Sequence, residues 1–374
     1  MAEELGTEPF VAAGHTIAQR LYELAYEIDL KQAEALWAGQ ERPASSRARL
    51  QATPPKAMSF GVPPLTVPLP PMILEGADGR WPASMTARLF DFGVVSLSLR
   101  VEAPAGPWEG FVGHCNAIAL AADPDNPLWA RAAGEVQRIF GPALRRPINW
   151  LIHEDYLLAV VTAFGENLTA ASLQDRVDLA RLLSGENARL SEGARADLLR
   201  ARFSYFPNDL VALSWDRALI VEPRGDTDVA DVLEVANAQL LEMRYYDELL
   251  DFELPRMYER VSSARGAAAW LSARRYARLA RQFTTLVAEV TELTEKVDNA
   301  LQVTEDVYLA RVYAAALELF RVPRLNAAVD RKLAIIRDIY TALYDEASDS
   351  RSAVMEIAIV GLIVAEIVLA LVRH

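Results

Sequence analysis

The chain has 374 residues, of which 52% are hydrophobic and 24% are charged, and its formal net charge at pH 7 is −13. This apolar content predicts a folded chain, and the length predicts one sizeable mixed domain with a helical appendage. The acidic balance excludes free DNA as the expected partner, because phosphate binding needs a concentrated basic surface.

The first part of the chain is predicted to be a mixed α/β domain over residues 15–260, preceded by a flexible N-terminus over residues 1–14. Residues 43–71 are rich in proline and lack a helical period, so they are predicted to be a surface loop. Hydrophobic periodicity predicts strands at Thr16–Glu23, Ala87–Val101, Trp150–Phe164 and Leu210–Val221, and helices at Lys31–Trp37, Pro127–Phe140, Ala170–Leu183 and Asp226–Glu259.

The long helix predicted over Asp226–Glu259 is the segment richest in polar residues beside an apolar face. One interpretation is a polar interface or a ligand site; the other is an ordinary amphipathic helix with a solvated face, which the charge spacing by itself favours. The candidate residues for such an interface or site, two of which precede the helix, are Asp209, Trp215, Glu234, Gln239, Glu242, Arg244 and Asp247.

A helical arm is predicted over residues 263–350. Its first helix has apolar residues at alternating spacings of three and four, and the spacing is typical of a coiled-coil seam or of a helix packed within its own subunit. These residues are Tyr276, Leu279, Phe283, Leu286, Val290, Leu293, Val297 and Ala300. Pro323 interrupts the pattern, and a second helix over Arg324–Ala347 would complete an antiparallel pair.

The tail over residues 353–372 is an almost unbroken apolar run with twelve Val, Leu or Ile residues. As a helix it would be about 30 Å long, which predicts a transmembrane anchor with the preceding domain on the cytoplasmic side. The alternative is a buried helix of a soluble core. Within the membrane, Glu356 and Glu366 with Gly361 and Ala365 are predicted to mediate assembly, since intramembrane carboxyls and small residues favour helix association.

Familiar catalytic motifs are missing from the sequence. It has no glycine-rich phosphate loop, no GxSxG elbow and no HExxH motif. The single cysteine, Cys115, excludes an intramolecular disulfide, and the four histidines are scattered without the spacing of a metal pair. We therefore predict no catalytic residue, no metal and no cofactor, although a site can also assemble from distant segments.

Several segments together resemble the "required for meiotic nuclear division" family, in its bacterial branch. They are LYELAYEIDLKQAEAL, FDFGVVSLSL, YFPNDLVALSWDRALIVEP, VLEVANAQLLEMRYYDELLDFEL, RLNAAVDRKLAIIRDIYTAL and MEIAIVGLIVAEIVL. The resemblance implies a domain without established catalytic residues, whose relatives support mitochondrial translation or cell division, and hence a ribosome or translation-related partner. The tail departs from the family where Met355-Glu356-Ile357 replaces its Leu-Glu-Trp start.

The sequence thus predicts an α+β protein with a mixed α/β soluble domain, a long helical hairpin or coiled-coil arm and one C-terminal transmembrane helix. The predicted function is a tail-anchored, homo-oligomeric membrane scaffold or adaptor. The alternative is a membrane-tethered enzyme or ligand sensor that uses an acidic and arginine-containing site around Tyr205–Asp216 and Glu234–Asp247. A cleft that joins these two segments would favour the alternative.

Overall fold

The computed structural model describes residues 8–40, 43–47, 58–148, 152–186, 188–264, 269–303 and 308–372. The chain forms two compact units, which are described separately. The first consists of Met1–Glu242 and Lys296–Pro323, and the second of Met243–Glu295 and Arg324–His374.

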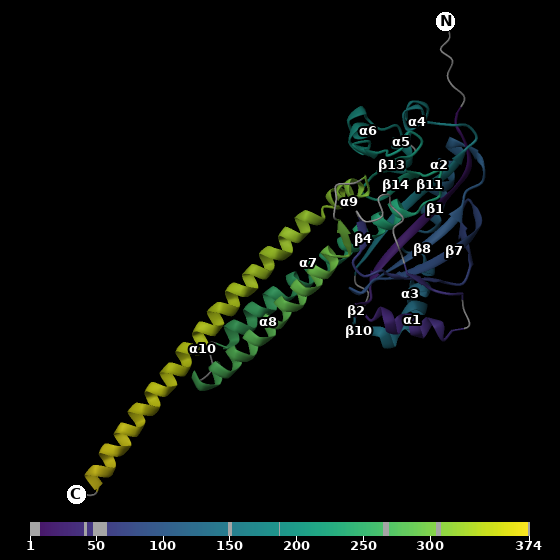
Figure 1. Ribbon diagram of the computed structural model, residues 1–374. Helices are drawn as coiled ribbons and strands as arrows, with labels where there is room; N and C mark the ends of the chain where they lie inside the picture. Colours follow the sequence, from purple (N-terminus) through teal and green to yellow (C-terminus); the bar gives the residue numbers. More distant parts are fainter. Residues whose placement is uncertain are drawn as a thin grey trace. The chain divides into compact units, whose positions relative to one another are not determined.

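The first unit is built on an eleven-stranded sheet (Figure 1). Its main path runs β12-β13-β14-β11-β1-β8-β7-β5-β3, with β6 paired to β7 and β9 paired to β1. Strand β11 pairs with β14 in parallel. The strands are β1 (Phe10–Glu23), β3 (Ser46–Arg47), β5 (Leu65–Pro68), β6 (Met72–Gly76), β7 (Gly79–Leu89), β8 (Val94–Glu102), β9 (Gly106–Pro107), β11 (His153–Phe164), β12 (Ala201–Phe203), β13 (Leu210–Leu213) and β14 (Arg217–Val221).

Two short ribbons lie outside this sheet. One pairs β2 (Ala25–Ile28) with β10 (Leu144–Pro147), and the other pairs β4 (Met58–Phe60) with β15 (Leu301–Val303). The second ribbon joins segments from opposite ends of the chain, which explains why the first unit includes residues that follow the helical segment in sequence.

Helices cover the sheet and bury its apolar side chains in two clusters. The first cluster includes side chains of α1 (Leu30–Ala38) and α3 (Pro127–Phe140), where Trp37 stacks on Phe140 with ring centroids 5.9 Å apart. The second includes α2 (Trp108–Ala121) and α5 (Leu179–Ser184). Figure 1 shows α1 and α3 near one end of the sheet, and α5 near the other with α4 (Ala170–Arg176) and α6 (Glu192–Leu198).

Local sequence explains where these helices begin. The Asp29 side chain accepts hydrogen bonds from the backbone N–H groups of Lys31 and Gln32 at the start of α1. Asn126 accepts one from the N–H of Leu128, and Pro127 occupies the first position of α3, where a helix needs no donor. The predicted helix Pro127–Phe140 is confirmed to its ends.

The second unit is helical. It contains the later part of α7 (Asp228–Ala264), most of α8 (Ala269–Asp298) and nearly all of α10 (Val322–Val372). Phe283 and Val290 of the predicted seam are buried within the single chain, so these positions pack intramolecularly. Pro323 lies in the first turn of α10 rather than between two packed helices, because proline is tolerated where the helix needs no N–H donor.

The predicted transmembrane anchor is wrong. In the ranges described above, no helix combines the length and the apolar character that a membrane crossing requires. Residues 353–372 form the end of the 51-residue helix α10 rather than a separate apolar helix. Glu356 and Glu366 interrupt the run, and a carboxylate at the centre of such a helix costs roughly 2.5–3.5 kcal/mol. The prediction of a single-pass membrane protein with its large domain on the cytoplasmic side depended on this anchor, so it is wrong as well.

Other predicted boundaries also change. The loop predicted over 43–71 contains β3, β4 and β5, while its residues 48–57 lie outside the described ranges. The strand Ala87–Val101 is two strands, since Gly93 reverses the chain with φ +104° in a place where a Cβ would lie 1.8 Å from the Ala25 carbonyl oxygen. The predicted helix Ala170–Leu183 is likewise two helices, α4 and α5.

Candidate functional site

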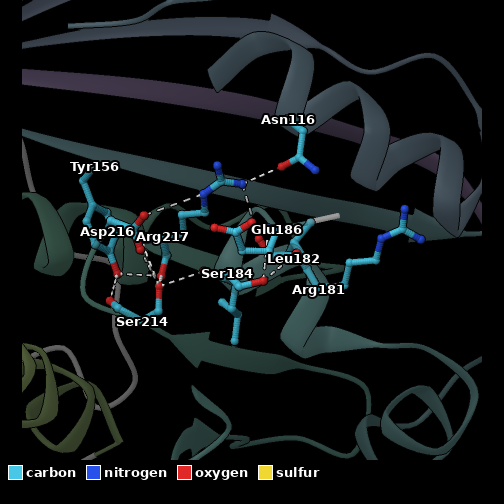
Figure 2. A network of polar contacts seen from close by, with 10 residues as sticks. Asn116, Tyr156, Arg181, Leu182, Ser184, Glu186, Ser214, Asp216 and Arg217 are labelled. Atoms are coloured by element: carbon cyan, nitrogen blue, oxygen red, sulfur yellow. Dashed lines mark hydrogen bonds and ion pairs between the residues drawn. The ribbon is translucent and has the colours of Figure 1, made fainter. Parts of the chain in front are cut away.

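A polar network surrounds the turn between β13 and β14 (Figure 2). The Tyr156 hydroxyl lies 2.9 Å from the carbonyl oxygens of both Ser214 and Arg217. The Ser214 hydroxyl oxygen accepts a hydrogen bond from the Arg217 N–H at 3.1 Å and lies 3.0 Å from Asp216 Oδ1. These contacts hold a tight turn against the central strand β11, because Tyr156 projects from that strand.

The Arg217 side chain joins this turn to two helices. Its Nη1 donates to Asn116 Oδ1 of α2 at 2.6 Å and reaches the Leu182 carbonyl oxygen of α5 at 3.5 Å. The guanidinium lies against Gly185, where an added Cβ would be 2.3 Å from Nη2 and where φ is +68°. Glycine is favoured at that position because other residues rarely adopt such a positive φ.

A cavity of about 170 Å³ opens beside the network and is lined by Ala18, Gln19, Ala119, Ala122, Pro124, Asp155, Tyr156, Leu157, Asp216 and Arg217. Arg20 supports its wall, since Nη2 donates to the Pro124 carbonyl oxygen at 2.9 Å and Nη1 lies 3.5 Å from Asp155. Burial raises the pKa of Asp216, while Ser214 and Arg217 oppose that shift. The cavity thus offers carboxylate and guanidinium groups to a small polar molecule.

The predicted residue Glu234 lies in a different, buried cluster on the sheet. Arg88 Nη1 of β7 is 2.7 Å from Asp231 Oδ1 and 2.5 Å from Glu234 Oε2 of α7. Burial raises the pKa of the Glu234 carboxyl, and the charge of Arg88 acts against this rise. One guanidinium thus bonds two carboxyls, and the cluster fixes the first turns of α7 on strand β7.

Glu242, two turns further along α7, meets a second carboxyl at the end of β1. Glu242 and Glu23 are 0% and 2% exposed. Burial raises the pKa of Glu23 well above its usual value, and the neighbouring charge and hydrogen bond of Glu242 add to the rise. Two carboxyls in such a site share a proton, because both cannot be charged at close range in a low dielectric.

Gln239 joins three helical segments of the first unit. Its Nε2 donates to the Val297 carbonyl oxygen at 2.7 Å, and its Oε1 accepts from the Tyr313 hydroxyl at 2.7 Å. Val297 lies at the end of α8 and Tyr313 lies in α9 (Tyr308–Leu319). The amide is satisfied on both sides, which indicates a packing role.

The remaining predicted residues lie apart from these. Asp209 accepts hydrogen bonds from the backbone N–H groups of Tyr205 and Phe206, at 2.7 and 3.0 Å, and so stabilises the turn before β13. Trp215 is 72% exposed in the turn after β13, next to the network around Arg217. Arg244 is exposed in the second unit, where Asp247 pairs with Lys332 at 2.7 Å.

The structure brings Glu234, Gln239 and Glu242 onto the buried side of one helix, while Asp209 and Trp215 lie in the turns on either side of β13. In the tail, the side chains of Glu356, Ala365 and Glu366 lie outside what is described, and Gly361 is exposed, with open space where a Cβ would be. Within the described residues, no group of three or more His, Cys, Asp or Glu side chains could hold a metal ion.

Sequence reasoning missed Arg88, Glu23, Arg20 and Arg217. A charged residue in an alternating strand such as Ala87-Arg88-Leu89 is typical of a solvated face, so the sequence did not indicate that Arg88 forms a buried ion pair. Arg20 and Glu23 could have been noticed, because each is a charged residue within a predicted strand, and charged residues are rarely buried without a partner.

The similarity to known proteins covers the part of the chain that forms most of the sheet and ends before the long helices. A family model described as "Uncharacterized protein MJ0711, N-terminal domain" matches residues 13–227, which end just before α7. The uncharacterized protein MJ0711 of Methanocaldococcus jannaschii is 26% identical over 196 residues, which are 52% of this chain and 59% of that protein. The match therefore covers less than two thirds of that relative. No solved structure matches the chain.

Proposed function

The chain belongs to the family of the uncharacterized MJ0711 N-terminal domain, and we propose that it acts as a self-associating scaffold, with the C-terminal part of α10 as its assembly element. The family description assigns no activity, so the proposal rests on the exposure of that helix. The resemblance to the "required for meiotic nuclear division" family and the translation-related partner that it implies stay predictions.

Four apolar positions within five consecutive described residues of α10 carry the proposal. Ile359, Val360, Leu362 and Ile363 are 53%, 55%, 71% and 51% exposed. At about 100° per residue they point to more than one side of the helix, so no single face hides them. A helix that is apolar on several sides is stable in water only when neighbours bury it, and a contiguous exposed apolar surface marks an interaction site.

The lengths of the helices in the second unit explain the exposure. Helix α10 has 51 residues and α8 has 30, which correspond to about 75 Å and about 45 Å at ~1.5 Å per residue. The shorter helix cannot cover the longer one along its whole length. A second copy of the chain would present the same apolar stretch, and two such stretches could bury each other.

The polar residues of α7 also support a scaffold. Arg88 bonds both Asp231 and Glu234, and Gln239 has partners on both sides. Their bonds hold elements of the fold together, which favours a structural use of these groups over catalysis.

Light scattering on the purified chain over a hundredfold range of protein concentration tests the proposal. We expect oligomers from the full chain, and monomers from a chain that stops at Ser350. Leu362→Glu should weaken association at least tenfold, because it places a charge in the buried contact. Ile335→Glu, at an apolar position of α10 that is 40% exposed, is the matched control and should associate normally. A full chain that is monomeric at every concentration would refute the proposal.

The cavity beside Arg217 favours a second function, the binding of a small polar ligand, independent of self-association. Its carboxylates and guanidinium could orient a zwitterion such as an amino acid. We expect an amino acid from a panel of the twenty to raise the melting temperature, and Ala119→Leu to abolish that shift by filling the cavity. Ala130→Leu, on the exposed face of α3, is the control. A flat response across the panel would eliminate this function.

A further inference from the structure

One edge of the sheet is left open at β6. This strand pairs with β7 through residues Met72–Gly76, and within the described ranges no strand pairs with its other edge. Unpaired N–H and C=O groups on such an edge form a template for a further strand. Ile73, in the middle of β6, is 57% exposed, although edge strands that avoid pairing usually carry a charge or a proline there.

The register identifies which backbone groups are free. Gly76 pairs with Gly79 across a two-residue turn, and the pair that closes such a turn is hydrogen-bonded. Hydrogen-bonded and non-hydrogen-bonded pairs alternate along an antiparallel ladder, so Ile73 and Glu75 occupy non-hydrogen-bonded positions. Pro82, which has no N–H, lies opposite Ile73 and fits this assignment. Ile73 and Glu75 therefore direct their N–H and C=O groups toward the open edge.

A groove lies between this strand and helix α3. Its volume is about 700 Å³, and its lining includes apolar side chains from both elements and from β7 behind them. Leu74, Met85 and Leu128 are buried and supply the apolar floor. Glu75 and Arg131 lie at the polar rim. The groove thus combines a free strand edge with an apolar surface beside it.

We propose that the groove binds an extended peptide segment of a partner protein, which adds a strand to β6. The free groups of Ile73 and Glu75 repeat at about 6.8 Å, which is the two-residue repeat of a neighbouring strand. A helix could not satisfy them, because its own backbone groups are bonded internally. Alternate side chains of the peptide would enter the groove, so the segment should carry apolar residues at every second position.

The neighbouring sequence limits the length of this pairing. Pro70 and Pro71 precede β6 and have no N–H groups to offer, and the turn at residues 77–78 ends the strand on the other side. The peptide should therefore form its backbone bonds over a short stretch, with Ile73 and Glu75 as the two bonding positions. This inference concerns the first unit and does not depend on self-association through α10.

Selection from a displayed library of random nine-residue peptides tests the inference on the full chain. Ile73→Pro removes the outward N–H without removing a ladder bond to β7, while Ile73→Thr keeps the N–H and serves as the control. We expect enriched peptides with apolar residues at alternate positions, which bind the wild-type and Ile73→Thr proteins and bind Ile73→Pro at least tenfold more weakly. Circular dichroism and the melting temperature verify that Ile73→Pro is folded.

A second measurement uses only the wild-type protein. In the best peptide, N-methylation of the amides that face β6 should abolish binding, and N-methylation of the alternate amides should leave it unchanged. The inference is overturned if no peptide is enriched relative to Ile73→Pro, or if both methylation patterns have the same effect. It is also overturned if light scattering shows that Ile73→Pro dissociates an oligomer of the chain, because the occupant would then be a second copy.

Discussion

At the scale of single residues, the paired carboxyls Glu23 and Glu242 are the most informative feature. Burial and the neighbouring carboxyl raise the pKa of Glu23 in the folded chain, so the folded state holds a proton that the unfolded state releases at lower pH. The stability due to this pair is therefore complete below the unfolded pKa and is lost as the pH rises through the folded pKa.

This predicts the effect of Glu242→Gln. The substitution removes one of the two charges and supplies an amide that can donate to Glu23, so less stability should be lost above about pH 5. Urea unfolding between pH 5 and 8 should show a flatter pH dependence than in the wild type, by up to ~1.4 kcal/mol per pH unit for one proton. Glu75→Gln, at an exposed ion pair, should keep the wild-type slope, and an unchanged slope in Glu242→Gln would contradict the shared proton.

At the scale of elements, the first turns of α7, which belong to the first unit, form buried polar bonds as well as apolar contacts. Arg88 bonds its first turns, and Gln239 connects it to α8 and α9. The Gln239 bonds are buried, so removal of one partner leaves the other without water or a replacement.

We therefore expect Tyr313→Phe to destabilise the first unit by ~1–3 kcal/mol, because the Gln239 Oε1 atom would stay buried without its donor. Chemical denaturation measures the change. Tyr258→Phe, at a tyrosine that is 56% exposed, is the matched control and should change the stability by less than ~0.5 kcal/mol. Equal effects of the two substitutions would show that the Gln239 bond adds little.

At the scale of the whole molecule, the described stretch of α10 over residues 359–363 exposes apolar side chains in the isolated chain. Ile359, Val360, Leu362 and Ile363 are more than half exposed, so their removal should cost little folding free energy. A chain stopped at Ser350 should therefore melt, at low concentration, within a few degrees of the full chain. Calorimetry would detect a larger drop, which would mean that the tail packs within its own chain.

The sequence by itself determined several elements because their signals are local. The apolar spacing and the Asn126-Pro127 start define the helix over residues 127–140, and the strand predicted over Thr16–Glu23 lies within β1. It also marked Glu234, Gln239 and Glu242 of α7 as candidate residues, although the charge spacing favoured an ordinary amphipathic helix. The prediction for the tail was wrong. Its apolar composition is typical of a membrane helix, but in the structure these residues continue the long helix α10.

Only the tertiary structure decided the partners of those residues. Arg88 precedes Glu234 by well over a hundred positions, Glu23 precedes Glu242 by more than two hundred, and Arg217 bonds Asn116, which lies 101 positions earlier. No local sequence pattern predicts such pairs. Side-chain type and spacing determine the secondary structure, whereas strand order and helix packing determine which side chains become neighbours. The open edge of β6 is likewise a property of strand order, since its sequence does not show which of its edges stays unpaired.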